Sequence, residues 1–154
     1  MKYPPGLRHV IAETRLFTDA QSYVIAKLPA HQSEEVIHIL TDLDNPLITL
    51  VWDKDEVTLV LPQEVWEARR PMLDVEEESP SYRLITFDLP LDLGLVGYLA
   101  ILATTVAEAG VSIFSISAYS RDHFLVPEDD FDRAWDALRA LIRSCQVDEA
   151  NDDF

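Results

Sequence analysis

Three kinds of residue are scarce in this chain of 154 residues, and each scarcity excludes a class of site. Its one cysteine, Cys145, cannot form an internal disulfide, which suits a reducing compartment. Its four glycines form neither a P-loop nor a Gly-x-Gly-x-x-Gly nucleotide motif. Its four histidines are scattered along the chain, which argues against a structural zinc site. We therefore expect no metal and no cofactor.

Basic residues are also few, because 12 lysines and arginines stand against 28 aspartates and glutamates. The formal net charge is −16. Nucleic-acid binding depends on clustered lysine and arginine that displace counterions from phosphates. The charge balance therefore argues against nucleic acid as a partner and disfavours anionic membranes.

Long hydrophobic runs are missing as well. The longest apolar stretch, residues 93–103, is too short to cross a bilayer and is soon followed by Glu108. No apolar segment of signal-peptide length follows the first residues. We expect a cytoplasmic protein without a membrane partner.

The chain does contain enough apolar residues for a packed core, since 48% of its residues are hydrophobic. The clearest shift in composition lies at residues 70–80, which hold two prolines and a run of three glutamates. This shift divides the chain into two halves. The predicted parts are a first module over 13–70, a linker over 71–81, a second module over 82–147 and a disordered acidic tail over 148–154.

The second half shows the clearer order of elements. They are a strand at 82–89, a helix from about 95 to 109, strands at 111–119 and 123–126, and a helix from 127 to about 143. This β-α-β-β-α order begins a ferredoxin-like βαββαβ unit. Its closing strand is not evident in the sequence, and either the first half or another chain could supply it.

The first half has a similar pattern on a smaller scale. It predicts a hairpin over 14–28, a helix over 34–40, strands at 47–52 and 57–61, and a short helix after Pro62. The segments "VTLVLPQEVW" and "HFLVPEDDFDRAW" each combine an apolar strand, a proline, acids and a tryptophan. We therefore predict an α+β fold in which two related ferredoxin-like modules are packed as one unit.

Two predicted helices differ in how they distribute apolar residues. In the last helix, Trp135 lies on an apolar stripe, so we expect it in the core. The helix over 95–109 is apolar nearly all round and must be covered on more than one side. Burial between the two halves and burial at a subunit interface both explain this pattern.

Asp122 and His123 are the one pair that suggests acid–base catalysis. Adjacent residues of a strand point to opposite faces, so direct cooperation between these two is awkward. No nucleophile, metal or cofactor motif accompanies them, and we expect a protein that is not an enzyme. Asp122 is then either a turn residue that accepts backbone N–H groups or a ligand-binding group.

The segment "DLPLDLGLVGYLAILATTVAEAGVSIFSISAYSRDHFLVPEDDF" resembles an ACT domain, a small ligand-sensing βαββαβ module. More narrowly, it resembles the tandem-ACT branch of small bacterial proteins and eukaryotic cytosolic arginine sensors. "SYVIAKLPA" and "LITLVWDKDEVTLVLP" in the first half are similar to the degenerate first module of that branch. The resemblance covers roughly residues 13–143.

The resemblance implies a ligand site at an interface between modules, in which Asp122 meets the amino group of the ligand. Tyr119 and the backbone over 118–121 match the rest of that wall. Ala118 replaces the usual threonine, and Arg121 replaces a residue that is usually small and polar or aromatic. The candidate ligand-binding residues are Gly94, Leu95, Val96, Gly97, Ala118, Tyr119, Ser120, Arg121 and Asp122.

The residue types alone support the same kind of ligand. A free amino acid carries a carboxylate and an ammonium group close together. The glycine-containing loop at 93–97 opens a helix whose free N–H groups can hold the carboxylate, and Asp122 can hold the ammonium. Arg121 is either a solvated turn residue or a reader of an acidic ligand side chain.

Three functions follow from these features. The first is a non-catalytic regulatory sensor that binds a small amino acid, forms a homodimer and acts on a regulated protein partner. The second is a ligand-free scaffold that docks a protein partner through its acidic surface and apolar helix. The third, an enzyme that uses Asp122 and His123, has the least support.

Overall fold

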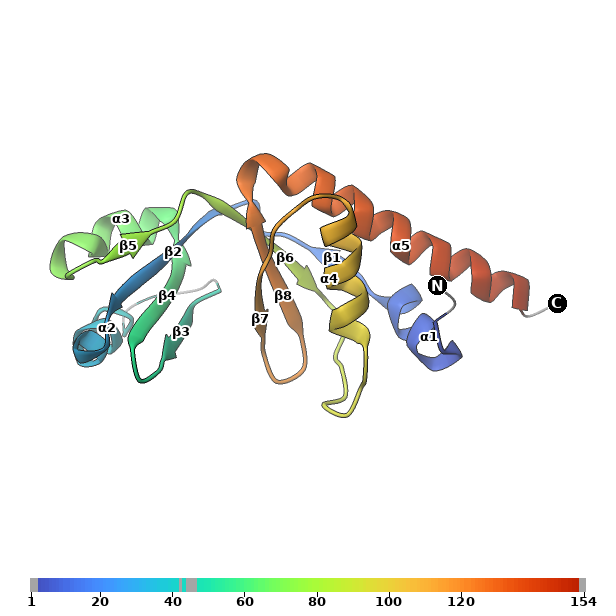
Figure 1. Cartoon of the computed structure of the whole chain (residues 1–154), viewed down its shortest axis with the longest axis horizontal. Coiled ribbons are helices and arrows are strands. Elements are labelled where there is room, and N and C mark those ends of the chain that lie inside the picture. The colour runs from blue at the N-terminus through green and yellow to red at the C-terminus, as the bar shows by residue number, and fades with distance from the viewer. Residues whose placement is uncertain (1–2, 42, 44–46, 153–154) are drawn as a thin grey trace. The chain divides into compact units, whose positions relative to one another are not determined.

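The computed structural model describes residues 3–41, 43 and 47–152 and is drawn in Figure 1. The chain divides into two compact units. We call residues Ala20–Arg83 the continuous unit, and residues Met1–Asp19 with Leu84–Phe154 the split unit. Among the helices of the described residues, none is long and apolar enough to span a membrane.

The continuous unit contains a complete βαββαβ order. Its elements are β2 (Ser22–Pro29), α2 (Ser33–Ile39), β3 (Thr49–Trp52), β4 (Glu56–Pro62), α3 (Gln63–Arg69) and β5 (Glu77–Glu78). The strands are antiparallel in the order β3-β4-β2-β5. Alternate residues Val57, Leu59 and Leu61 on one face of β4 are buried, and Val60 on the opposite face is buried as well. They share one core with Trp66 of α3.

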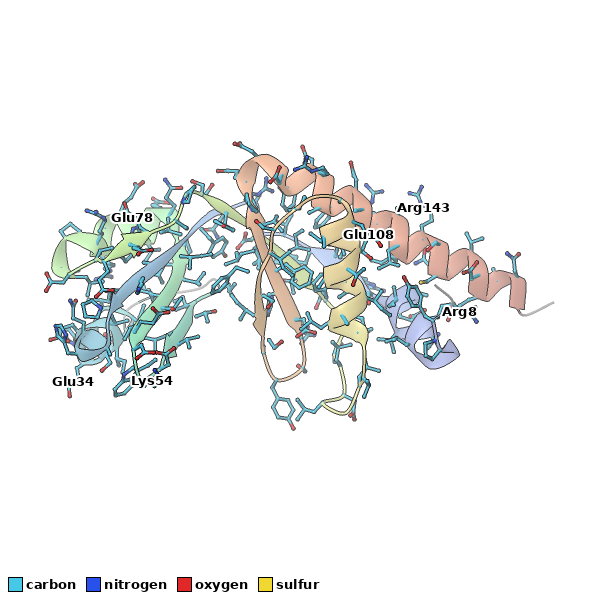
Figure 2. The ribbon with its side chains drawn as sticks, viewed as in Figure 1. Arg8, Glu34, Lys54, Glu78, Glu108 and Arg143 are labelled. Atoms are coloured by element: carbon cyan, nitrogen blue, oxygen red, sulfur yellow. The ribbon has the colours of Figure 1, made fainter. Side chains whose placement is uncertain are left out.

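Residues 71–81, where the composition predicts a linker, are instead integrated into this unit. Glu77 and Glu78 form β5 and pair with Lys27 and Ala26 of β2. The carboxylate of Glu78, labelled in Figure 2, accepts hydrogen bonds from Trp66 Nε1 at 2.9 Å and Arg70 Nε at 2.7 Å. The composition indicates a linker because it does not reveal that this polar segment pairs with Ala26 and Lys27, which are distant in sequence.

The split unit contains the second module. Its elements are α1 (Pro5–Glu13), β1 (Leu16–Phe17), β6 (Tyr82–Phe87), α4 (Tyr98–Glu108), β7 (Phe114–Ser117), β8 (Asp122–Pro127) and α5 (Phe131–Asp152). The first two residues of β6 belong to the continuous unit. The strand order is β1-β6-β8-β7, and the core contains Phe87, Leu102, Phe124 and Leu138. The predicted α+β, ferredoxin-like fold is confirmed.

The missing closing strand of the second module comes from the start of the chain. Leu16 pairs with Phe87, and Phe17 pairs with Thr86, in antiparallel register. The predicted hairpin over 14–28 is therefore wrong. β2 already pairs with β4 on one edge and with β5 and β6 on the other, so it has no edge left for β1.

The last helix is longer than predicted. It was expected to end near Arg143 and to be followed by a disordered tail over 148–154, but α5 continues to Asp152. Gln146 Nε2 donates to the Ala12 carbonyl at 2.9 Å, and His9 Nδ1 lies 3.0 Å from Glu149 Oε1. These partners belong to α1, a helix that the prediction missed. The remaining residues 153–154 of the predicted tail lie outside the described residues.

The apolar helix begins later than predicted, at Tyr98 instead of about Leu95. Gly97 precedes it with a φ of +91°, a left-handed conformation that an ordinary residue adopts at a cost. Leu102 and Val106 are fully buried in the core of the split unit. These side chains are therefore covered within the split unit itself.

Candidate ligand site in the split unit

A cavity of about 590 Å³ lies between the start of α4 and the β7–β8 hairpin. Figure 1 shows the start of α4 beside the turn of the β7–β8 hairpin. Six of the predicted residues line it: Leu95, Gly97, Ala118, Tyr119, Arg121 and Asp122. Gly94, Val96 and Ser120 do not line it. The loop before the helix and the turn of the hairpin, which the sequence analysis singled out, thus meet at one hollow.

The helix start supplies backbone donors to this hollow. The first helical bond of α4 runs from Ile101 N to the Gly97 carbonyl at 3.1 Å. The amides of Tyr98, Leu99 and Ala100 therefore have no intrahelical partner. Within the described residues no side chain caps this end, and all three residues line the cavity. Unpaired amides at a helix start are the feature from which the sequence predicts a site for a carboxylate.

The hairpin supplies a carboxylate on the opposite wall. Ser117 and Asp122 form the last strand pair, and Ala118 N donates to the Arg121 carbonyl at 2.9 Å to close the turn. Asp122 is half-buried, and its Oδ1 accepts a hydrogen bond from Ser117 Oγ at 2.6 Å. In the described part of the chain no backbone amide bonds this carboxylate. The turn-stabilising alternative for Asp122 therefore has no support here.

Two more charged side chains, Asp92 and Arg121, line the cavity, and Asp88 is bonded to the second of them. Asp92 Oδ1 accepts the Gly94 amide at 2.7 Å, which shapes the loop before α4. Arg121 Nε donates to Asp88 Oδ1 at 2.9 Å, and both side chains are partly exposed. Arg121 is therefore not a freely solvated turn residue. Its guanidinium group is also not free to bind an acidic ligand side chain unless it leaves Asp88. With its charge matched by Asp88, the carboxylates of Asp92 and Asp122 favour a cationic group in the hollow.

Tyr98 links the cavity to the interior. Its side chain is 2% exposed, and its hydroxyl lies 2.8 Å from Thr14 Oγ1. The Thr14 hydroxyl donates to the Val10 carbonyl at 2.8 Å, so Tyr98 is the donor in their shared bond. Burial, with a smaller effect from the negative charge of Asp122, raises the pKa of Tyr98 to about 12. The tyrosine therefore stays neutral and hydrogen-bonded to Thr14. Neither Tyr98 nor Thr14 is among the residues that the sequence predicts for the site.

His123 does not form an acid–base pair with Asp122 at the cavity. Its Nδ1 lies 2.8 Å from Thr86 Oγ1, and it does not line the hollow. Burial lowers the pKa of His123, against the opposing effect of the Asp122 charge. Within the described residues, no group of three or more His, Cys, Asp or Glu side chains could hold a metal ion.

Known structures of the same fold come from several bacteria. A Vibrio cholerae protein of unknown function is 24% identical over 88% of this chain and 95% of its own, with a TM-score of 0.69. An Agrobacterium tumefaciens protein is 22% identical over 84% and 89%, with a TM-score of 0.67. The regulatory subunit of aspartate kinase from Thermus flavus is 15% identical over 82% and 95%, with a TM-score of 0.59. At these identities the likeness shows the fold.

Family comparison is more specific about the second half. None of the curated proteins matches this chain in sequence. The model of the ACT domain matches residues 77–140, a range that includes β6, α4, β7, β8 and every candidate ligand-binding residue. This chain therefore contains a segment, residues 77–140, that matches the ACT domain.

Proposed function

We propose that this protein is a non-catalytic regulatory sensor that binds a free amino acid in the cavity between α4 and the β7–β8 hairpin. Regulatory ligand binding is the role that an ACT domain supports. One observation carries the finer proposal. Free amides at the start of α4 and the half-buried carboxylate of Asp122 line the same cavity.

The two ends of an amino acid match these two groups. Its carboxylate would accept hydrogen bonds from the amides of Tyr98, Leu99 and Ala100, where the helix dipole favours negative charge. Its ammonium group would donate to the Asp122 carboxylate in a charge-assisted bond. The apolar side chains of Leu95 and Leu99 offer a surface for the ligand side chain. The cavity volume lies in the usual range for small-molecule sites.

A second copy of the chain would complete the site. Leu93, Val96 and Tyr119 are 68%, 86% and 81% exposed, although all three are large and apolar or aromatic. Leu93 and Tyr119 also line the cavity. A homodimer that covers these residues would shield the ligand from water, and binding would then shift the packing of the two copies. The protein controlled by that shift would be a separate regulated partner.

Thermal unfolding with each of the twenty common amino acids tests this function. We expect one amino acid, or a few related ones, to raise the melting temperature. A ligand present at a hundred times its dissociation constant stabilises the folded state by about 2.7 kcal/mol. Asp122→Asn keeps the shape and the Ser117 contact but removes the charge, so we expect at least tenfold weaker binding.

Asp53→Asn is the matched control, because Asp53 occupies the β3–β4 hairpin of the continuous unit and binds its own turn. It should leave ligand affinity unchanged. A melting temperature that does not respond to any amino acid would contradict the sensor and favour the scaffold. Equal loss of affinity in both variants would contradict the role given to Asp122.

A further inference from the structure

A second hollow lies elsewhere in the split unit, between β1 and α5, and has a volume of about 370 Å³. Leu16, Trp135 and Ile142 supply its apolar surface, and Arg139, Arg143 and Gln146 supply most of its polar groups. It shares no lining residue with the cavity at α4. The proposed amino-acid site therefore does not account for it.

Arg139 and Arg143 are the unusual residues of this hollow. They are one helical turn apart on α5, where side chains lie about 5–6 Å from each other at Cβ and like charges repel. Within the described part of the chain, neither guanidinium group has an ion pair or a hydrogen bond, although the protein carries 28 acids. Arg133 on the same helix, in contrast, pairs with Asp130.

The helix dipole does not explain these two arginines. Cations stabilise the last turn of a helix. α5 continues to Asp152, and its last turn contains no basic residue. Arg143, shown projecting from α5 in Figure 2, therefore lies well before the helix end.

The other polar side chains of the hollow, Thr14 and Gln146, already take part in hydrogen bonds. The Thr14 hydroxyl is bonded to Val10 and Tyr98, and Gln146 Nε2 donates to the Ala12 carbonyl. Trp135 is half-buried, and its ring stacks on Phe131 at a centroid distance of 5.4 Å and an interplanar angle of 27°. Two guanidinium groups without a partner among the described residues thus line a hollow that also has an apolar wall.

We propose that this hollow binds a small organic anion, in which a carboxylate or phosphate group is attached to a flat apolar group. The anion would lie between Arg139 and Arg143, because guanidinium groups bind both kinds of oxygen anion through paired hydrogen bonds. The apolar part would contact Trp135 and Ile142. The bound charge would also remove the repulsion between the two arginines.

Titration of the full chain with phenyl phosphate and with benzoate, followed by NMR of the Trp135 indole N–H and the arginine Nε–H groups, tests this proposal. We expect saturable shifts of the Trp135, Arg139 and Arg143 signals with at least one of the two anions. The anion that binds with the higher affinity identifies the preferred acid group. Benzyl alcohol, which has the same ring without the charge, should not produce them. Affinity should also fall as the salt concentration rises.

The double variant Arg139→Gln/Arg143→Gln should bind at least tenfold more weakly. Both side chains are exposed, so its melting temperature should stay close to that of the parent. Arg133→Gln is the matched control and should keep full affinity. Asp122→Asn should also keep it, which separates this site from the amino-acid site. Unsaturable shifts, equal shifts with benzyl alcohol, or equal weakening by Arg133→Gln would overturn the proposal.

Discussion

The two units have the same strand order, but the start of α4 in the split unit differs from the start of α2 in the continuous unit. All four glycines of the chain lie in the split unit, and Gly97 opens the start of α4 to the cavity. In the continuous unit, β2 passes through a short turn at Ala30–Gln32 directly into α2. The Gln32 side chain is 5% exposed and bonds both the amide and the carbonyl of Asp74. The start of α4 thus lines a cavity, whereas the glutamine before α2 is buried and bonded within its own unit.

The hairpins of the two units differ in whether their aspartate is bonded to its own turn. Asp53 Oδ1 accepts the amides of Asp55 at 2.8 Å and Glu56 at 2.9 Å, and these bonds lower the pKa of Asp53. Asp122 accepts only a hydroxyl within the described residues and lines the cavity. Asp53 thus stabilises the turn of its own hairpin, which is the role that was one alternative for Asp122 in the β7–β8 hairpin. An aspartate in a hairpin becomes available for a ligand only where the turn does not use it.

The largest effect we expect comes from α1, the helix that only the split unit has. Ile11 is fully buried in the core of that unit, so Ile11→Ala should cost about 2–5 kcal/mol of its stability. Ile37→Ala on α2 is the control, because Ile37 is 51% exposed, and should cost about 0.5 kcal/mol or less. Hydrogen exchange measures both: β8 amides should lose protection in Ile11→Ala while β4 amides keep theirs. Equal loss in β4 and β8 would show that α1 does not distinguish the units.

The second effect concerns the buried Tyr98–Thr14 bond. The pKa of Tyr98 is about 12 in the folded state and near 10 in the unfolded chain, so the folded state holds its proton more tightly. This contribution is complete below pH 10 and is lost as pH rises towards 12, by about 2–3 kcal/mol in total. Urea unfolding between pH 9 and 11.5 should therefore show a shallower decline in Tyr98→Phe. Tyr119→Phe, which changes an exposed tyrosine, should decline as steeply as the parent.

The smallest effect sharpens the contrast in glycine content. Gly97→Ala places a Cβ on a residue with a φ of +91°, and we expect a loss of about 1–2 kcal/mol. Gly6→Ala lies in α1, where the added Cβ meets open space, and should stabilise the protein by about 0.4–1 kcal/mol. Melting temperatures of the two variants should therefore move in opposite directions. A Gly97→Ala protein as stable as the parent would mean that the helix start does not need glycine.

Some parts of the fold and of the candidate site are readable in local sequence. The strands β4 and β8, which each end in a proline and precede a helix with a tryptophan, are evident from their apolar pattern. Trp66 is buried as this pattern predicts, whereas Trp135 is only half-buried against the core. The sequence predicts Gly97 and Asp122 as two walls of one site because their chemistry is local: a glycine lets a ligand approach the backbone, and an aspartate supplies a fixed charge. Whether these two walls meet depends on how α4 packs beside the β7–β8 hairpin. The local sequence of neither segment specifies that packing.

The sequence by itself determined the period of each strand and helix, the excess of acid and the absence of a nucleotide or zinc motif, because these depend on neighbours a few residues apart. Only the tertiary structure decided that β1 pairs with Thr86 and Phe87 of β6, which lie beyond the whole continuous unit in sequence. It also decided that Thr14 bonds Tyr98 and that Arg139 and Arg143 face a hollow beside β1. The physical reason is that edge pairing and burial depend on which surfaces meet, and no local periodicity specifies a partner so distant in the chain.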